Sequence, residues 1–283
     1  MKRIRSIDAM KAEARGQSAA GRTIGLVPTM GALHEGHLSL VRESRRIATT
    51  TVVSIFVNPL QFGAGEDFTK YPRDIDRDAA LLEKEDVDFL FLPDAAEMYP
   101  PGFQTTVEVA RLQANLCGAS RPGHFKGVAT VVLKLLNIVR PNFAFFGQKD
   151  AQQAVVLRRL AADLNLDVAV RIMPIVREPD GLAMSSRNAY LSAADRQAAV
   201  VLSRSLAEAR RAFGAGERRA AEITARVRKV IAGEPAARVD YIETVGWPDL
   251  AGLDIIDREA LVAVAVKIGR TRLIDNTILT LKE

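Results

Sequence analysis

Short apolar segments alternate with helical segments over the first 176 residues, and this alternation limits the possible folds more than any other feature of the sequence. Apolar runs rich in β-branched or aromatic residues occupy residues 23–29, 51–57, 89–93 and 144–147. Helical patterns lie at residues 37–48, 73–86, 127–139 and 151–165. Strands that alternate with helices in this way form a parallel sheet with helices on both faces. We therefore predict a doubly wound α/β domain.

A second domain is predicted after this one because the pattern changes. A further strand over residues 168–176 leads into a turn-rich segment with Pro179 and Gly181, which we interpret as the domain junction. Two helices, at about 193–213 and 217–232, then precede strands at 239–245, 260–268 and 277–281. The predicted fold is a Rossmann-like doubly wound parallel sheet over residues 1–176, followed by a smaller α+β domain over residues 177–283 that acts as a lid.

Composition excludes several classes of protein. No apolar run reaches the roughly 18 to 20 residues of a spanning helix, and the N-terminus lacks the apolar stretch of a signal peptide, so we expect a cytoplasmic protein with no membrane partner. The single cysteine, Cys117, rules out an intrachain disulfide, and we interpret it as a small buried residue and not a nucleophile. The net charge of +5 suits anionic ligands such as ATP, and nucleic acid equally.

The segment from Pro28 to His37 joins the first strand to the first long helix. Glycines at such a turn let backbone amides approach a phosphate, and the helix N-terminus adds partial positive charge. His34 and His37 are three residues apart on the first turn, so both could donate to phosphate oxygens as charge grows in a transition state. The spacing does not match the zinc-protease motif His-Glu-x-x-His. The chain has only three histidines, and two of them lie within these four residues, which also argues against a role as ordinary surface residues.

Polar side chains follow the later strands, where an α/β sheet places its ligand crevice. Asn58 and Gln61 follow the second strand, and the Gln61 amide could bind a carboxylate and a hydroxyl, or could cap a loop. Lys149 and Asp150 follow the strand that ends at Gly147, and Lys149 there could neutralise phosphate charge. Elsewhere such a lysine would be a surface residue.

A glycine-containing loop carries the sequence Met184-Ser185-Ser186-Arg187. Two hydroxyls and a guanidinium in a flexible loop are suited to closing over a triphosphate. A serine-rich linker is the alternative interpretation of these residues.

Together these motifs resemble those of the pantothenate synthetase family. His-x-Gly-His after a first strand is typical of the wider nucleotidylyltransferase superfamily, which includes the class I aminoacyl-tRNA synthetases, and the Ser-Ser-Arg loop is similar to their Lys-Met-Ser-Lys-Ser loop. The longer string PTMGALHEGH is similar to the narrower family. Further matching blocks follow in the family's order, over nearly the whole chain and without a departing position: IFVNPLQF, YPR, RPGHFKGV, FFGQKDAQQ, REPDGLAMSSRN and TRLIDN.

The resemblance implies an ATP-dependent ligase that condenses (R)-pantoate with β-alanine through a pantoyl adenylate and releases AMP and pyrophosphate. It also implies Mg²⁺ bound with ATP, through ligands that the sequence does not identify, and a homodimer. The apolar strand at 260–268 could serve the dimer interface or a core within its own domain.

The resemblance also implies roles for individual residues. Catalysis is assigned to His34, His37, Lys149 and Arg187. ATP binding is assigned to Met30, Gly31, His34, His37, Gly147, Gln148, Lys149, Asp150, Val176, Met184, Ser185, Ser186 and Arg187. Pantoate and β-alanine are assigned to Gln61, Gln153, Asn58, Arg121 and His124, although a structural role is an alternative for Arg121 and His124, as it is for Tyr71, Pro72 and Arg73.

Two other functions remain open at this point. A nucleotidylyltransferase that moves AMP onto a phosphorylated cofactor precursor would share the histidines and the Ser-Ser-Arg loop, but would not need Gln153. An RNA-binding module is motivated by the arginines of the 193–232 helices. These arginines alternate with glutamates and lack an aromatic stacking platform, so we expect a solvated face and no nucleic-acid partner.

Overall fold

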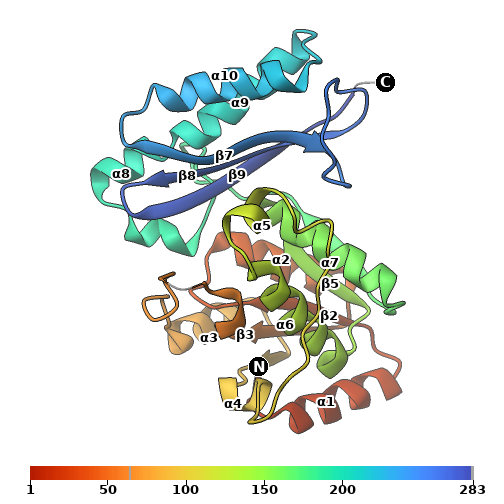
Figure 1. Cartoon of the computed structure of the whole chain (residues 1–283). Helices are drawn as coiled ribbons and strands as arrows, with labels where there is room; N and C mark the ends of the chain where they lie inside the picture. The colour runs from red at the N-terminus through yellow and green to blue at the C-terminus, as the bar shows by residue number, and fades with distance from the viewer. Residues whose placement is uncertain (64, 282–283) are drawn as a thin grey trace.

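The structure is a computed structural model that describes residues 1–63 and 65–281, and it contains two sheets, one in each part of the chain (Figure 1). The larger sheet has six strands in the order β1-β4-β3-β2-β5-β6, and all neighbouring strands are parallel. The strands are β1 (Lys2–Ile4), β2 (Ile24–Thr29), β3 (Thr50–Ile55), β4 (Phe89–Phe91), β5 (Phe143–Gly147) and β6 (Ala169–Met173).

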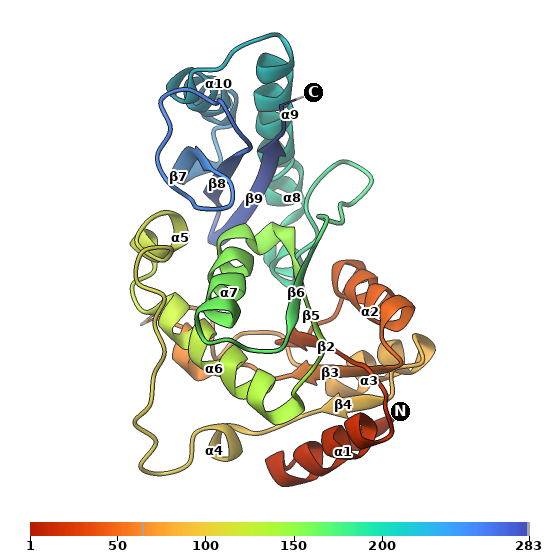
Figure 2. The same cartoon turned by 90° about the vertical axis from the view of Figure 1, so that its right-hand side faces the viewer.

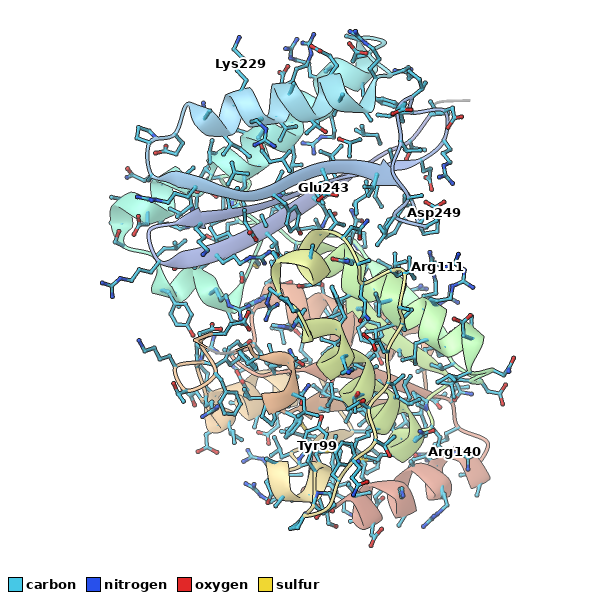
Figure 3. All side chains as sticks on the ribbon, viewed as in Figure 1. Tyr99, Arg111, Arg140, Lys229, Glu243 and Asp249 are labelled. Carbon is cyan, nitrogen blue, oxygen red and sulfur yellow. The ribbon has the colours of Figure 1, made fainter. Side chains whose placement is uncertain are left out.

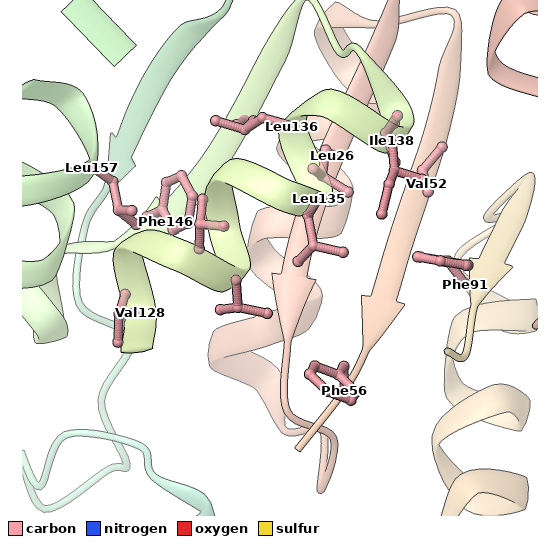
Figure 4. Close-up of a cluster of buried hydrophobic side chains, with 14 of the residues drawn as sticks. Leu26, Val52, Phe56, Phe91, Val128, Leu135, Leu136, Ile138, Phe146 and Leu157 are labelled. Atoms are coloured by element: carbon pink, nitrogen blue, oxygen red, sulfur yellow. The ribbon is translucent and has the colours of Figure 1, made fainter. Parts of the chain in front are cut away.

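Helices cover both faces of this sheet, as predicted (Figure 2). Helices α2 (Glu35–Ile47) and α3 (Ile75–Lys84) pack on one face, against Val27, Val53 and Phe145. Helices α1 (Ile7–Ala19), α6 (His124–Val139) and α7 (Ala151–Asp163) pack on the other. Figure 4 shows that second core, where neighbouring strand residues such as Leu26 and Val52 meet α6. Successive strand residues thus alternate between two cores, which confirms the doubly wound fold.

The strand order reverses beside β2. The chain passes from β2 through β3 to β4 on one side, then returns to β5 on the other side of β2. Helix α2 leaves the end of β2 on one face and α7 follows β5 on the opposite face, so a crevice opens between the carboxyl ends of the two strands. Thr29 and Gly147 mark those ends.

The smaller domain contains an antiparallel sheet in the order β7-β8-β9, formed by β7 (Ala237–Gly246), β8 (Ala260–Ile268) and β9 (Thr271–Leu279). Helices α8 (Ala193–Ala198), α9 (Val201–Gly214) and α10 (Ala220–Ala232) belong to the same domain. One core lies between α9, α10 and this sheet. On the other face of this sheet, Leu261 and Ala263 pack against Leu116 and Val155 of the larger domain. The apolar strand predicted at 260–268 is therefore the central strand β8, and packing within the chain accounts for its burial.

Charged side chains of α9 and α10 form local ion pairs. Arg211 pairs with Glu208 at 2.8 Å in α9, and Arg226 pairs with Glu222 at 3.7 Å in α10. Figure 3 shows Lys229 of α10 directed away from the rest of the molecule. This matches the solvated face predicted for these helices. Among the described residues, no helix is both long and apolar enough to cross a membrane.

Several elements differ from the prediction. Strand β1 and helices α1, α4 (Ala95–Met98) and α5 (Leu116–Ser120) were not predicted, because each is short or largely polar. The predicted helix over 193–213 is two helices, and between them the Leu202 amide donates to the Ala199 carbonyl, a tighter turn than an α-helix makes.

The last strand also differs from the prediction, since β9 begins at Thr271 and not at Thr277. The polar residues Asp275 and Asn276 interrupt its apolar pattern, yet both are buried. The domain boundary predicted between residues 176 and 177 falls between the end of β6 and the start of α8, and stays a prediction.

Candidate active site

A cavity of about 210 Å³ lies at the crevice between the ends of β2 and β5. Helix α6 and the strand ends supply apolar walls such as Val131, Leu135 and Phe56. The predicted ATP-binding residues that line the cavity are Met30, His34, His37, Gly147, Lys149, Asp150, Val176, Met184, Ser185, Ser186 and Arg187. Gln61 and Gln153 line it as well. Gly31 and Gln148 are not among the lining residues and belong to the adjoining turns.

A second cavity of about 60 Å³ adjoins the first and lies between the two domains. The two cavities share Lys149, Asp150, Gln153, Ser185 and Arg187. Arg121 and His124 line only the second one, as do the C-terminal residues Arg272 and Asn276. Both domains therefore contribute to the space around Lys149.

The two histidines at the start of α2 are held as neutral donors. His34 is the N-cap residue, and its Nδ1 accepts from the Gly36 amide at 3.1 Å, while Nδ1 of His37 accepts from the His34 amide at 3.4 Å. An imidazole whose Nδ1 accepts carries its proton on Nε2. Burial, assisted by Lys149, lowers the pKa of His34 to about 4, and burial next to His34 lowers the pKa of His37 well below its usual value. Both rings thus have a free Nε2–H to donate.

Gly36 has to be glycine for this arrangement to form. A Cβ atom there would lie 2.9 Å from Cε1 and 3.0 Å from Nδ1 of His34, too close for the ring to keep its place. The two imidazole rings lie 4.1 Å apart between their centroids. The glycine of the His-x-Gly-His motif therefore has a packing reason in addition to its place at a helix start.

The loop that precedes α2 is held from beneath by Asp78 of α3, a residue the sequence did not indicate. Gly31 and Ala32 have positive φ angles of 84° and 50°. The buried carboxylate of Asp78 accepts from the Leu33 amide at 2.8 Å, and its pKa is raised by burial, against the effect of hydrogen bonds from Leu33 and Ala32. This contact fixes a backbone conformation that L-residues rarely adopt, and with it the position of His34.

The Gln61 amide is oriented by buried groups behind it. Asn58, only 1% exposed, donates from Nδ2 to Oε1 of Gln61 at 3.0 Å and to the Gly127 carbonyl at 3.1 Å. Its Oδ1 accepts from the Tyr99 hydroxyl at 2.8 Å. Because Oε1 of Gln61 already accepts, Nε2 is the end that faces the cavity, where it lies 3.0 Å from Sδ of Met30. Asn58 itself does not line the cavity.

Arg121 and His124 form a hydrogen-bonded cluster with Glu66 and with the backbone of Gln61. Arg121 makes two 2.7 Å bonds to the Glu66 carboxylate and one of 2.9 Å from Nη1 to Nε2 of His124. His124 then donates from Nδ1 to the Gln61 carbonyl at 2.9 Å, since a guanidinium can only donate. Burial and the nearby Arg121 lower the pKa of His124 to about 4. Burial would raise the pKa of Glu66, but its bonds from Arg121 hold it at about 2. The side chains of Arg121 and His124 are therefore hydrogen-bonded to other groups of the protein. Their predicted contact with substrate stays a prediction.

The Ser-Ser-Arg loop spans from one domain to the other. The Ser186 hydroxyl donates to the Ala32 carbonyl at 2.9 Å, next to the histidine loop. Arg187 makes two bonds of 2.9 Å to Asp67. Tyr190, three residues on, donates to the Lys70 carbonyl at 3.1 Å. Asp67 gave no signal in the sequence, because nothing local distinguishes it from other surface acids.

Tyr71, Arg73 and Cys117 are held by contacts with other residues of the protein. Tyr71 is buried and lines the larger cavity, while Arg73 donates to the Phe68 carbonyl at 2.9 Å. Cys117 is buried, as predicted, with its Sγ 3.2 Å from the Tyr241 hydroxyl.

The fold and the cavity define an α/β enzyme whose site lies at the switch point of a parallel sheet. A family model of pantoate-β-alanine ligases matches residues 2–278. The chain therefore belongs to the pantoate-β-alanine ligase family. The pantothenate synthetase of Pelotomaculum thermopropionicum is 57% identical over 274 residues, which cover 97% of each chain.

Solved structures agree with this assignment. The pantothenate synthetase of Thermus thermophilus superposes with a TM-score of 0.93 at 45% identity, over 98% of this chain and 99% of that one. The pantoate-β-alanine ligase of Francisella tularensis, complexed with β-γ ATP and β-alanine, superposes with a TM-score of 0.80 at 33% identity, over 98% and 97% of the two chains.

Proposed function

We propose that this chain condenses pantoate with β-alanine at the expense of ATP, through a pantoyl adenylate, and releases AMP and pyrophosphate. The observation that carries the proposal is the cavity in which two neutral histidines, Lys149 and Arg187 surround the same space as the amides of Gln61 and Gln153. The names of the relatives support the two substrates, and the Francisella tularensis complex supports ATP and β-alanine as ligands.

The reaction requires an activated carboxylate, because a free carboxylate is a poor electrophile. In the first step a carboxylate oxygen of pantoate bonds to the α phosphorus of ATP while the bond to the bridging oxygen of pyrophosphate breaks. In the second step the amine nitrogen of β-alanine bonds to the acyl carbon, AMP leaves with the electron pair of the broken C–O bond, and the nitrogen loses a proton. Negative charge therefore grows on phosphate oxygens in the first step.

We assign the stabilisation of that charge to the histidine pair and to Lys149. Neutral imidazoles donate through Nε2 without first taking up a proton, and donors fixed before the reaction are the most effective ones. Lys149 adds a positive charge at the end of β5. Arg187 can add a second one if ATP displaces Asp67 as its partner, since a triphosphate offers more acceptor oxygens than one carboxylate.

We assign pantoate to Gln61 and Gln153. The orientation that Asn58 imposes leaves Nε2 of Gln61 as a donor for a carboxylate or hydroxyl oxygen. In this proposal Asn58, Arg121 and His124 hold Gln61 and Glu66 in place, and their contribution to substrate binding acts through Gln61.

The intermediate in this proposal is carried by AMP and not by the enzyme. The hydroxyl of Ser185 accepts from the Arg187 amide at 3.3 Å, and that of Ser186 donates to a carbonyl. Neither hydroxyl is hydrogen-bonded to a histidine, and Cys117 lies outside the larger cavity. Within the part of the chain that the structure describes, none of the three hydrogen-bonds to a histidine that could act as its base, since Sγ of Cys117 contacts the Tyr241 hydroxyl and Arg272.

Magnesium is proposed to enter bound to the triphosphate. Over residues 1–63 and 65–281 there is no group of three histidine, cysteine or acidic side chains placed to hold a metal ion, so these residues do not fit a metal centre built by the protein. Magnesium usually keeps several waters and binds through substrate phosphates, so such a centre is not required.

Pyrophosphate exchange tests the proposed order of steps. Enzyme given pantoate, magnesium and ATP without β-alanine should exchange labelled pyrophosphate into ATP, and His37→Ala should suppress the exchange. A strict requirement for β-alanine would refute the adenylate, and exchange without pantoate would indicate an adenylated enzyme. Transfer of AMP to a phosphorylated acceptor, with no exchange on pantoate, would favour the alternative nucleotidylyltransferase.

Three further predictions from the sequence remain proposals: a homodimer, a lid movement of the second domain and a cytoplasmic location. The family resemblance supports the first, and the loop contacts between the domains support the second. Sedimentation at micromolar concentration, hydrogen exchange with and without ATP, and cell fractionation would test them in turn.

A further inference from the structure

The last of the sequence blocks singled out above, TRLIDN, ends in two buried polar residues on β9, Asp275 and Asn276, and Asn276 reaches out of its own domain. Nδ2 of Asn276 donates to the carbonyls of Gln148 and Lys149, at 2.9 and 3.0 Å. Its Oδ1 accepts from Nε2 of Gln148 at 3.2 Å. Two carbonyl oxygens can only accept, so the NH₂ end of the amide must face them. The whole amide of Asn276, which is 3% exposed, is thus committed to one turn of the larger domain.

That turn, the 3-10 turn η2 (Gln148–Asp150), carries Lys149 and has no anchor of its own. Neither η2 nor the start of α7 has a side-chain cap. The Lys149 side chain is 21% exposed and lies 3.7 Å from the neighbouring Asp150. Local contacts therefore leave the direction of the lysine weakly determined, and the hydrogen bonds from Asn276 supply the missing constraint.

The neighbouring Asp275 binds a second segment of the site, the one that precedes the Ser-Ser-Arg loop. Its carboxylate, 1% exposed, makes bonds of 2.7 and 2.9 Å to Arg177, and Arg177 donates to the Gly181 carbonyl at 3.0 Å. This pair orders the segment that leads to the Ser-Ser-Arg loop. Two consecutive residues of β9 therefore hold the two segments that carry Lys149 and Arg187.

We infer that Asn276 is a positioning residue for Lys149, so that the docked second domain sets the place of a lysine that belongs to the first. The inference rests on the proposed function, in which Lys149 acts on the phosphates of ATP. If β9 moves away when the domain opens, the carbonyls of Gln148 and Lys149 lose their donors, and the turn is free to relax. Docking of the second domain and placement of the lysine are then one event.

Asn276→Ala and Asn276→Asp test the inference. Both remove the donors, and the aspartate also brings a negative charge against two carbonyl oxygens. A misplacement of about 1 Å can cost about 100-fold in rate, so we expect pantoate-dependent pyrophosphate exchange to fall by roughly 10- to 100-fold, with the KM for pantoate within about threefold of wild type. Thr277→Ala is the matched control, since that hydroxyl accepts from Arg210 within the second domain, and it should keep wild-type exchange.

A double-mutant cycle with Lys149→Ala separates positioning from general damage. If Asn276 acts through Lys149, the double variant should exchange no more slowly than Lys149→Ala alone. Losses that multiply would overturn the inference and leave the proposed function standing. Wild-type exchange by Lys149→Ala would remove the proposed role of the lysine, and this inference with it. If both Asn276 variants fail to fold while Thr277→Ala folds, Asn276 serves stability and the inference is wrong.

Discussion

Gly127→Ala should separate α6 from the 3-10 turn η1 (Pro59–Gln61) and thereby displace the Gln61 amide. A Cβ atom at this position would lie 2.2 Å from the Leu60 carbonyl oxygen and 2.6 Å from the Gln61 nitrogen. Even close carbon–oxygen contacts are about 3.3 Å, so the two segments must move apart by roughly 1 Å. The clash involves backbone atoms on η1, which a change of rotamer cannot relieve.

The size of the effect follows from two opposing contributions. Alanine favours a helix over glycine by about 0.5 to 1 kcal/mol, whereas overpacking costs about 1 to 3 kcal/mol. We expect a net destabilisation of up to about 2.5 kcal/mol, which corresponds to a Tm lower by up to about 10 °C. A displacement of about 1 Å at Gln61 should also lower the exchange rate with pantoate by about 100-fold.

Calorimetry and pyrophosphate exchange at varied pantoate and ATP would measure both effects. The KM for pantoate should rise while that for ATP stays within about threefold, because the histidine loop is anchored separately. Gly16→Ala in α1 is the control, since a Cβ atom there meets nothing within 4 Å, and it should stabilise the protein by about 0.5 to 1 kcal/mol. A Gly127→Ala protein with a raised Tm and an unchanged KM for pantoate would refute the reasoning.

Three further predictions follow from the site. Lys149→Ala should fold and lower turnover by roughly 100- to 1000-fold, and steady-state rates within threefold of wild type would make it a surface residue. Because burial lowers the pKa of His34 and His124 to about 4, and that of His37 well below 6.5, no imidazole NMR signal should titrate near pH 6.5. Unfolded histidines take up protons near pH 6.5, so stability should fall as the pH drops from about 6.5 to about 4, and a denaturation midpoint that is flat across this window would contradict the burial argument. ATP should slow hydrogen exchange in the 177–188 loop, and equal exchange with and without ATP would argue against closure over the nucleotide.

The sheet and most of its helices were predictable because the spacing of apolar residues along each segment shows which positions are buried. The strands are short runs rich in apolar and β-branched residues, as parallel strands covered on both faces require. Helix α1 lacks this pattern, with only Met10 and Ala14 buried, although Ser6 before it is a usable N-cap signal. Strand β9 was shortened in the prediction because its buried polar residues break the apolar alternation.

Many of the residues predicted for the candidate site lie in the segments that follow strands of the sheet. His34, Gln61 and Lys149 belong to this group, since the carboxyl ends of parallel strands meet at one edge. Asp78 and Asn276 do not, because each acts on a loop far away in the sequence. Their role arises from contacts that exist only in the folded chain.

By itself the sequence determined the alternation of strands and helices in the first domain, the glycines that the histidine turn requires and the set of motifs that identifies the family. These properties depend on neighbouring residues, whose side-chain size, polarity and spacing act before any long-range contact forms. Only the tertiary structure decided that the histidines are neutral, that Arg187 is paired with Asp67 and that Asn276 anchors the turn of Lys149. Each of these depends on burial or on a partner distant in the sequence, and both arise only when the two domains pack around one crevice.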